Sequence, residues 1–180
     1  MEFTLTPIKD LVVIQPSVFE DDRGCFFESY NEFFFAQNGI DIKFVQDNQS
    51  ISHKSVLRGL HFQIPPYSQA KLVRVIKGSV LDVAVDIRKK SDTYGQYFSI
   101  ELNETNKTML YIPEGFAHGF IAKENDTVFV YKCSNFYVKE SERCILWNDP
   151  IIDIDWHERN PIISEKDKLG ALLNQIDLPF

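Results

Sequence analysis

Two histidines in this 180-residue chain stand in segments whose composition suggests chemistry. His61 lies in Leu57-Arg-Gly-Leu-His61-Phe-Gln63, and His118 ends the segment Tyr111-Ile-Pro-Glu-Gly-Phe-Ala-His118. The second segment contains a tight turn of proline and glycine that delivers His118 onto a strand. Imidazole side chains in such positions either bind a metal ion or transfer protons near neutral pH. The residues around each histidine distinguish these two chemistries.

Paired histidines on two strands of an all-β chain suggest a cupin barrel, whose family pattern includes a metal site. The segment Pro113-x-Gly115-x-x-His118 fits that pattern. The metal-binding version of the first segment reads His-x-His followed by a glutamate, but here Gln63 replaces the second histidine and the next charged residue is Lys71. Divalent ions take imidazole, thiolate or carboxylate ligands, and an ammonium group is none of these. We therefore predict proton chemistry without a metal or any other cofactor.

Length and composition favour a single domain over residues 1–180 with a substantial core. Fifteen phenylalanines and seven tyrosines favour strands. No apolar run approaches the roughly 20 residues that a spanning helix needs, and the N-terminus lacks the layout of a signal peptide. The three cysteines share no metal-type spacing, which fits reduced thiols. These features predict a cytoplasmic protein, and the net charge of −7 disfavours binding to nucleic acid or to an anionic membrane.

Strand-like runs recur about every ten residues, which predicts a sandwich or closed barrel. Short helices are expected at Asn31–Gln37, capped by Asn31, and after Ser164, where Ser164-x-x-Asp167 resembles a capping arrangement before Leu169–Leu173. The expected strands are Leu11–Ile14, Gly24–Tyr30, Lys43–Ile51, Lys71–Ile76, Val80–Ile87, Gln96–Leu102, Thr108–Ile112, Gly119–Lys123 and Thr127–Cys133.

One hairpin can be given a register. If Lys77 and Gly78 form a two-residue turn, Val73 pairs with Asp82, and the next pair on the same face is Lys71 with Ala84. Lys71, Val73, Asp82, Ala84 and Asp86 then share one mixed face of the hairpin. Periodicity alone leaves two alternatives open, a pocket wall and a solvated surface with an ion pair.

Over almost its whole length the sequence resembles the dTDP-4-dehydrorhamnose 3,5-epimerase family. The resemblance implies an all-β cupin-type jelly-roll barrel, or double-stranded β-helix, with a few short peripheral helices. It also implies a metal-free homodimer that epimerises C3 and C5 of a 4-keto-6-deoxyhexose carried on thymidine diphosphate, a step toward activated L-rhamnose. The segments that carry it are Asp22-Arg-Gly-x-Phe-Phe-Glu28, Phe44-Val-Gln-Asp-Asn48, Val56-Leu-Arg-Gly-Leu-His-Phe-Gln63, Lys71-Leu-Val-Arg-Val75, Gly78-x-Val-x-Asp-Val-Ala-Val-Asp-Ile-Arg88, Ile112-Pro-Glu-Gly-Phe-Ala-His-Gly-Phe120, Tyr131-Lys, Tyr137, Trp147-Asn-Asp-Pro150, Asp155-Trp156 and Ser164-x-Lys166-Asp167.

The resemblance implies catalytic roles for four residues. His61 is the base that removes the proton next to the ketone, and Asp167 orients it. Tyr131 is the acid on the opposite ring face, and Lys71 stabilises the enolate oxygen. His118 and Asp82 form a second histidine–carboxylate pair that shapes the pocket. From the residues alone, each of these has an ordinary structural explanation, such as a core histidine or a helix-terminal aspartate.

The resemblance also implies how the nucleotide is held. Arg23 and Arg58 bind the diphosphate, because guanidinium groups suit phosphate oxygens. Gly59 is expected to permit a bulge that turns Arg58 and His61 toward one face. N-terminal residues are expected to reach the site of the neighbouring subunit. The base and sugar contacts are Phe26, Glu28, Gln46 and Asn48, with Tyr137 as a stacking surface for thymine.

Three residues depart from the family pattern: Cys25, Gln49 and Tyr111 stand where an aromatic residue, a histidine and a tryptophan are common. They put fine specificity in doubt more than the type of reaction. The alternatives are an epimerase that acts only at C3 or only at C5, a noncatalytic sugar-binding barrel, and a metal-dependent cupin oxygenase. Gln63 and Lys71 argue against the last.

Overall fold

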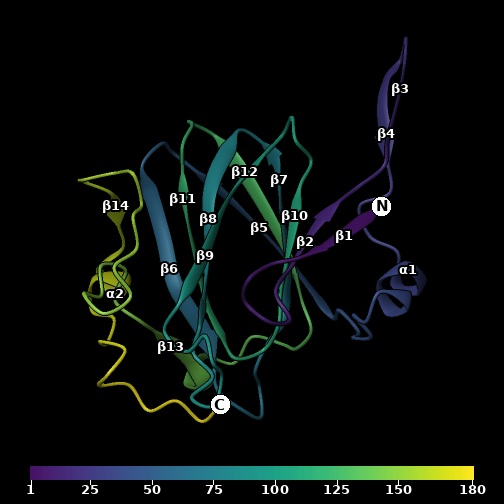
Figure 1. Ribbon diagram of the computed structural model, residues 1–180. Coiled ribbons are helices and arrows are strands. Elements are labelled where there is room, and N and C mark those ends of the chain that lie inside the picture. The colour runs from purple at the N-terminus through teal and green to yellow at the C-terminus, as the bar shows by residue number, and fades with distance from the viewer.

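Two six-stranded sheets face each other and form the body of the protein, which the computed structural model describes over residues 1–180 (Figure 1). The first sheet has the order β1-β2-β10-β7-β12-β5, with strands Glu2–Leu5, Val12–Gln15, Met109–Ile112, Lys71–Lys77, Thr127–Cys133 and Gln46–Ser52. The second has the order β13-β6-β11-β8-β9, with strands Glu142–Cys144, Val56–Gln63, Phe116–Ala122, Ser79–Asp86 and Tyr97–Asn103, and β14 (Ile162–Ile163) pairs with β6. Apart from the consecutive pairs β1–β2 and β8–β9, neighbouring strands come from distant parts of the chain, as in a jelly roll. The predicted all-β cupin-type barrel is confirmed.

The remaining elements lie outside the two sheets. Strands β3 (Val18–Asp21) and β4 (Gly24–Phe27) pair only with each other and form a ribbon that projects away from the barrel (Figure 1). A 3-10 helix, Lys139–Ser141, precedes β13. The two α-helices are short, and no helix has the length and apolar character needed to cross a membrane.

Both α-helices begin where the sequence predicts. Asn31 caps α1 (Glu32–Gln37) by accepting hydrogen bonds from the N–H groups of Phe33 and Phe34 at 3.1 and 3.3 Å. Ser164 caps α2 (Glu165–Lys168) by accepting a hydrogen bond from the N–H of Asp167 at 3.1 Å. Helix α2 ends at Lys168, so the segment after it is not helical. The predicted strands are all present, with their ends shifted by up to three residues.

Alternation of side chains along the strands divides the apolar core into three clusters. The first cluster fills the barrel between the sheets and includes Val73, Ala84 and Phe129. The second lies between the outer face of the second sheet and the C-terminal segment, and the third lies between the outer face of the first sheet and α1. Because apolar material covers both outer faces, the interior of the barrel can hold polar groups.

The predicted β7–β8 hairpin is wrong. Strand β7 pairs with β10 and β12, whereas β8 pairs with β11 and β9, so these consecutive strands belong to different sheets. Only Gly78 separates them, with a φ of 77°, and a Cβ at this position would lie 2.6 Å from Thr127 Oγ1. The chain therefore crosses between sheets here. The predicted grouping of side chains on one face is nevertheless correct. Val73 and Ala84 both lie in the barrel interior, although their strands do not pair.

Candidate active site

A cavity of about 590 Å³ opens between the two sheets, and strands of both sheets line it together with α2. Polar side chains dominate its wall. The predicted site residues that line it are Gln46, Asn48, Arg58, His61, Lys71, His118, Tyr131, Tyr137 and Asp167.

A bulge in β6 brings two of these residues to the same wall. Arg58 and His61 are three residues apart, a spacing that would place them on opposite faces of a regular strand. Gly59 and Leu60 together oppose the single residue Gly119 of β11, which shifts the register. A Cβ on Gly59 would lie 2.5 Å from the Cα of Gly119, so the approach requires glycine. The predicted bulge is confirmed.

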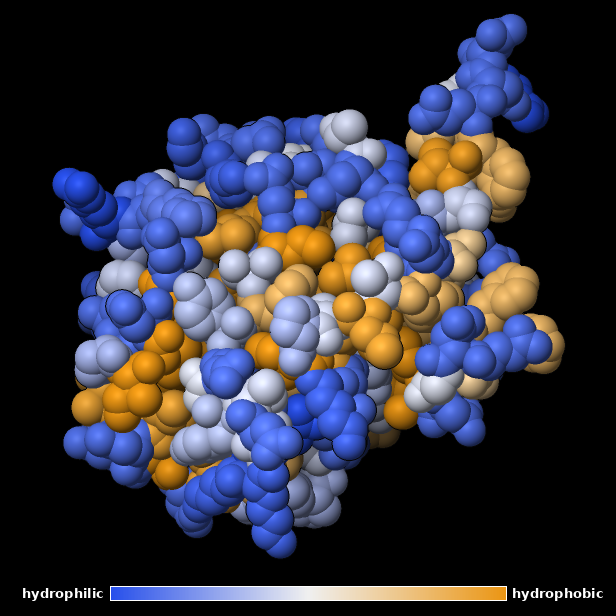
Figure 2. Space-filling model, viewed as in Figure 1, coloured by the Kyte–Doolittle hydropathy of each residue, from blue (hydrophilic) through white to orange (hydrophobic).

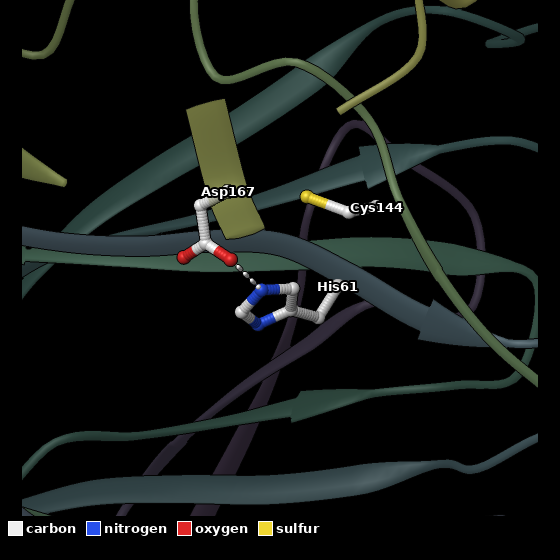
Figure 3. A group of neighbouring side chains, drawn as sticks. All are labelled: His61, Cys144 and Asp167. Atoms are coloured by element: carbon white, nitrogen blue, oxygen red, sulfur yellow. Dashed lines mark hydrogen bonds and ion pairs between the residues drawn. The ribbon is translucent and has the colours of Figure 1, made fainter. Parts of the chain in front are cut away.

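His61 and Asp167 form a close pair although 106 residues separate them in the chain. The Nε2 atom of His61 lies 2.8 Å from Oδ1 of Asp167, as the dashed line in Figure 3 marks. Burial alone would favour the neutral acid, but hydrogen bonds from His61 and from the N–H of Gly59 outweigh it and lower the pKa of Asp167. A charged Asp167 holds the ring proton on Nε2, which leaves Nδ1 as the basic nitrogen.

His118 and Asp82 form the second predicted pair, deeper in the barrel. The Nε2 atom of His118 lies 2.9 Å from Oδ2 of Asp82, and both side chains are buried. Burial lowers the pKa of His118 even though Asp82 opposes this shift, so the ring is neutral at pH 7. The other carboxylate oxygen of Asp82 has no hydrogen-bond partner. This pair is a buried polar support for the cavity wall.

Lys71 and Tyr131 reach the cavity from the opposite sheet. The Nζ atom of Lys71 lies 3.4 Å from the carbonyl oxygen of His61 and 5.9 Å from the centre of the Tyr131 ring. Burial lowers the pKa of Lys71, and nearby groups, Cys133 first and then Asp82, oppose this only in part. Burial also raises the pKa of Tyr131 to about 12, so its hydroxyl keeps its proton at neutral pH. The cavity therefore contains an imidazole, a protonated tyrosine hydroxyl and a lysine amine.

Gln63 stands where the cupin pattern has a metal-binding histidine. Its side-chain nitrogen donates to the carbonyl oxygens of Tyr67 and Phe136 at 2.6 and 3.1 Å, and its oxygen accepts from the N–H of Val138 at 2.7 Å. These bonds tie two loops together, use both N–H groups of the amide and hold its oxygen on a backbone N–H group. With the ammonium group of Lys71 alongside, the residues present do not fit the cupin metal site.

Two residues of the site escaped the sequence analysis as functional residues. Glu142 on β13 and Lys166 on α2 line the cavity and form an ion pair, and the hydroxyl of Tyr137 donates to Glu142 Oε2 at 2.8 Å. Burial favours neutral Glu142, but the hydrogen bonds from Lys166 and Tyr137 outweigh it and lower the pKa of Glu142. Lys166 could have been found from the sequence, because it stands next to Asp167 in the segment Ser164-x-Lys166-Asp167 that resembles the family. The three-residue strand β13 gives no periodicity from which Glu142 could be found.

Most predicted nucleotide contacts line the cavity. Gln46 donates to Asn48 Oδ1 at 3.0 Å and accepts from the N–H of Tyr137 at 3.0 Å, so these three residues form one connected group. The guanidinium group of Arg58 donates to Ser52 Oγ at 3.2 Å. Along β5, the cavity wall therefore offers amides and an aromatic ring near Gln46 and a guanidinium group near Ser52.

Three predicted contacts do not reach the cavity. Arg23 lies at the tip of the projecting ribbon, where it pairs with Asp21 at 2.5 Å. The side chain of Phe26 is 72% exposed on the same ribbon. Glu28 follows the ribbon and accepts hydrogen bonds from Asn31 at 3.1 Å. None of the three lines the cavity, and neither do Cys25, Gln49 and Tyr111, the departures from the family pattern.

The fold and the cavity together define a cupin-type barrel in which a histidine–aspartate pair, a tyrosine hydroxyl and a lysine amine line one cavity. The family model described as dTDP-4-dehydrorhamnose 3,5-epimerase matches residues 5–175, and the chain belongs to this family.

Three relatives place the chain within this family. A dTDP-4-dehydrorhamnose 3,5-epimerase of Shigella flexneri is 51% identical over 171 residues, which is 94% of each chain. The crystal structure of a dTDP-6-deoxy-D-glucose-3,5-epimerase of Legionella pneumophila, in complex with dTDP-4-keto-L-rhamnose, has a TM-score of 0.94 and 44% identity over 98% of this chain and 94% of that one. A 3'-monoepimerase of Streptomyces bikiniensis is less similar, with a TM-score of 0.88 and 31% identity over 94% of this chain and 86% of that one.

Proposed function

We propose that this protein epimerises dTDP-4-dehydro-6-deoxy-D-glucose at C3 and C5 and so forms dTDP-4-dehydro-L-rhamnose, a step in the biosynthesis of dTDP-L-rhamnose. The observation that carries the proposal is the His61–Asp167 pair opening onto the same cavity as Lys71 and Tyr131. The names of the relatives from Shigella flexneri and Legionella pneumophila support the substrate class.

His61 begins each inversion by removing the proton on the carbon next to the C4 ketone. The proton moves to Nδ1, and the charged Asp167 stabilises the imidazolium cation that results. The electron pair of the C–H bond moves into the ring and leaves a negative charge on the ketone oxygen. A positioned base of this kind contributes roughly 10²–10⁴-fold to the rate.

Lys71 stabilises the enolate. Its ammonium group is buried and makes one long hydrogen bond to a backbone carbonyl, so it has donors left for the oxyanion. A single preorganised donor at such an oxygen contributes roughly 3–4 kcal/mol. His118, held by Asp82, shapes the same region of the cavity.

Tyr131 completes the inversion by donating its proton to the carbanion from the opposite ring face. Its raised pKa keeps the hydroxyl protonated until charge develops on the carbon. Return of the proton from the His61 side regenerates the substrate, whereas delivery from Tyr131 inverts the centre. The tyrosinate left behind regains a proton from water, and His61 releases the one it took.

Deuterium labelling tests the proposal and separates it from its alternatives. With the 4-keto sugar nucleotide in deuterated water, NMR is expected to find deuterium at both C3 and C5 of the product. Label at one carbon only would favour a single-site epimerase, as the monoepimerase relative is named. Absence of label with intact dTDP binding would favour a noncatalytic sugar-binding barrel.

Metal independence is part of the proposal, because Gln63 is occupied by backbone groups and Lys71 brings a positive charge. Full activity is expected after prolonged chelation, and elemental analysis should find no stoichiometric transition metal. Activity that is lost on chelation and restored by one divalent ion would contradict this prediction.

The functional unit proposed is a homodimer in which the β3–β4 ribbon completes the neighbour's site. The ribbon projects from the barrel, and apolar residues gather at its base (Figure 2). Phe19 and Phe26 are 66% and 72% exposed there, which is unusual for large aromatic side chains unless a partner covers them. Arg23 at the tip then supplies a second guanidinium group to the diphosphate beside Arg58 of the neighbour.

Mixing two inactive variants is expected to restore activity if the ribbon is shared in this way. In a heterodimer of Arg23→Ala and His61→Ala, one site combines an intact Arg23 with an intact His61. Random exchange of equal amounts makes about half of the dimers heterodimers. Only one of the two sites in each heterodimer is complete, so about a quarter of wild-type activity should return.

The matched control mixes His61→Ala with Tyr131→Phe, because both substitutions affect the cavity of their own subunit. That mixture should stay inactive in forming inverted product. A monomer in solution, or no gain from the Arg23→Ala mixture, would contradict the shared site.

A further inference from the structure

Cys144 lies against the catalytic pair and has no part in the mechanism above. It is opposite His61 in the β13–β6 pairing, and Figure 3 shows its thiol beside His61 and Asp167. The sulfur atom, a ring nitrogen of His61 and a carboxylate oxygen of Asp167 all lie within 4.8 Å of one another. The thiol donates a hydrogen bond of 3.4 Å to the carbonyl oxygen of Ile145.

Sulfur, imidazole nitrogen and carboxylate oxygen are the three donor types of protein zinc sites. Bonds of about 2.0–2.3 Å around a tetrahedral ion place its ligand atoms about 3.5 Å apart. The sulfur of Cys144 would move inward by about an ångström, and Asp167 and His61 would separate slightly. The three residues come from β13, β6 and the capped α2, so the backbone holds them in this arrangement.

We propose that Cys144, His61 and Asp167 form an inhibitory site for a thiophilic divalent cation such as Zn²⁺ or Cd²⁺. The cation binds Sγ of Cys144, Nε2 of His61 and Oδ1 of Asp167, with water as a fourth ligand. The thiol proton leaves to solvent, and the proton on Nε2 moves to Nδ1. The imidazole then has no free basic nitrogen, and Asp167 no longer orients it.

The donor atoms of the site favour soft cations over hard ones. One sulfur and one imidazole nitrogen among three donors suit an ion that bonds strongly to sulfur and displaces the thiol proton. Mg²⁺ and Ca²⁺, which select oxygen ligands, are excluded by this donor set.

Cadmium titration tests binding without reference to turnover, because a thiolate–Cd²⁺ bond has an ultraviolet charge-transfer band. The titration uses a Cys25→Ser background, since Cys25 is exposed and offers a competing thiol. One equivalent of Cd²⁺ is expected to produce the band, and Cys144→Ser and Cys144→Ala should abolish it. The matched control Cys133→Ser removes a buried cysteine outside the cluster and should keep the band. A band that persists in both Cys144 variants would overturn the proposal.

Inhibition is measured with the same variants, and this part alone rests on the proposed function. Zn²⁺ and Cd²⁺ should inhibit epimerisation reversibly, and a chelator should restore it. Cys144→Ala should keep its basal rate and require at least about tenfold more cation for half-inhibition, as expected for loss of a ligand. Equal inhibition of wild type and Cys144→Ala would overturn the inhibitory role. A protein with no epimerase activity but a Cys144-dependent band would overturn the proposed function and leave the cation site standing.

Discussion

Replacing His61 with alanine is expected to abolish epimerisation while leaving dTDP binding almost unchanged. In the proposed mechanism the imidazole removes the α-proton, whereas the residues predicted to hold the nucleotide are other side chains of the cavity wall. Loss of a general base lowers the rate by roughly 10²–10⁴-fold. Steady-state turnover and calorimetric titration with dTDP measure the two effects separately.

His157 provides a matched control for this substitution. It also pairs with an aspartate, with Nδ1 at 3.0 Å from Oδ2 of Asp155, but the pair is exposed and outside the cavity. His157→Ala should therefore keep its activity. Retention of more than about a hundredth of wild-type turnover in His61→Ala would be hard to reconcile with a general base.

Tyr131→Phe is expected to separate hydrogen exchange from inversion. Without the hydroxyl, His61 still removes the α-proton and returns deuterium from its own side, so exchange into deuterated water continues. Delivery from the opposite face fails, and formation of inverted product should fall much further than exchange. The ratio of the two rates is the diagnostic quantity, because a binding defect lowers both together.

Tyr94→Phe is the control for Tyr131→Phe, since it removes a partly exposed hydroxyl away from the cavity and should leave the ratio unchanged. NMR of the substrate and product pools gives both rates in one experiment. Equal slowing of exchange and inversion with intact substrate affinity would show that another group or water delivers the proton.

Several features could be predicted from residues that are close together in the sequence. The caps at Asn31 and Ser164 depend on residues within one turn, so their prediction needed no tertiary information. The bulge at Gly59 followed from the need to turn two side chains to one face, and the structure has it. The replacement of a metal-binding histidine by Gln63 was visible as a residue type, although its three backbone bonds were not.

The failed β7–β8 hairpin illustrates the limit of local information. Two alternating strands joined by Lys77-Gly78 satisfy every local rule for a hairpin. Whether the chain turns back or crosses to the facing sheet depends on pairing with β10, β11 and β12. The residues that pair with these strands are separated from them by 30 or more positions in the chain. Periodicity nevertheless assigned the correct faces, because alternation along a strand is the same in both arrangements.

The sequence by itself determined which reactive side chains were available. These are His61, His118, Lys71, Tyr131 and the aspartate Asp167 in the first turn of a capped helix. Only the tertiary structure decided which of these groups meet. Asp167 reaches His61 across 106 residues, Glu142 and Lys166 join at the rim, and Cys144 lies beside the catalytic pair. These contacts depend on long-range strand pairing and on where the C-terminal segment packs. No local pattern encodes such distances, because they result from burying apolar faces of the whole chain together.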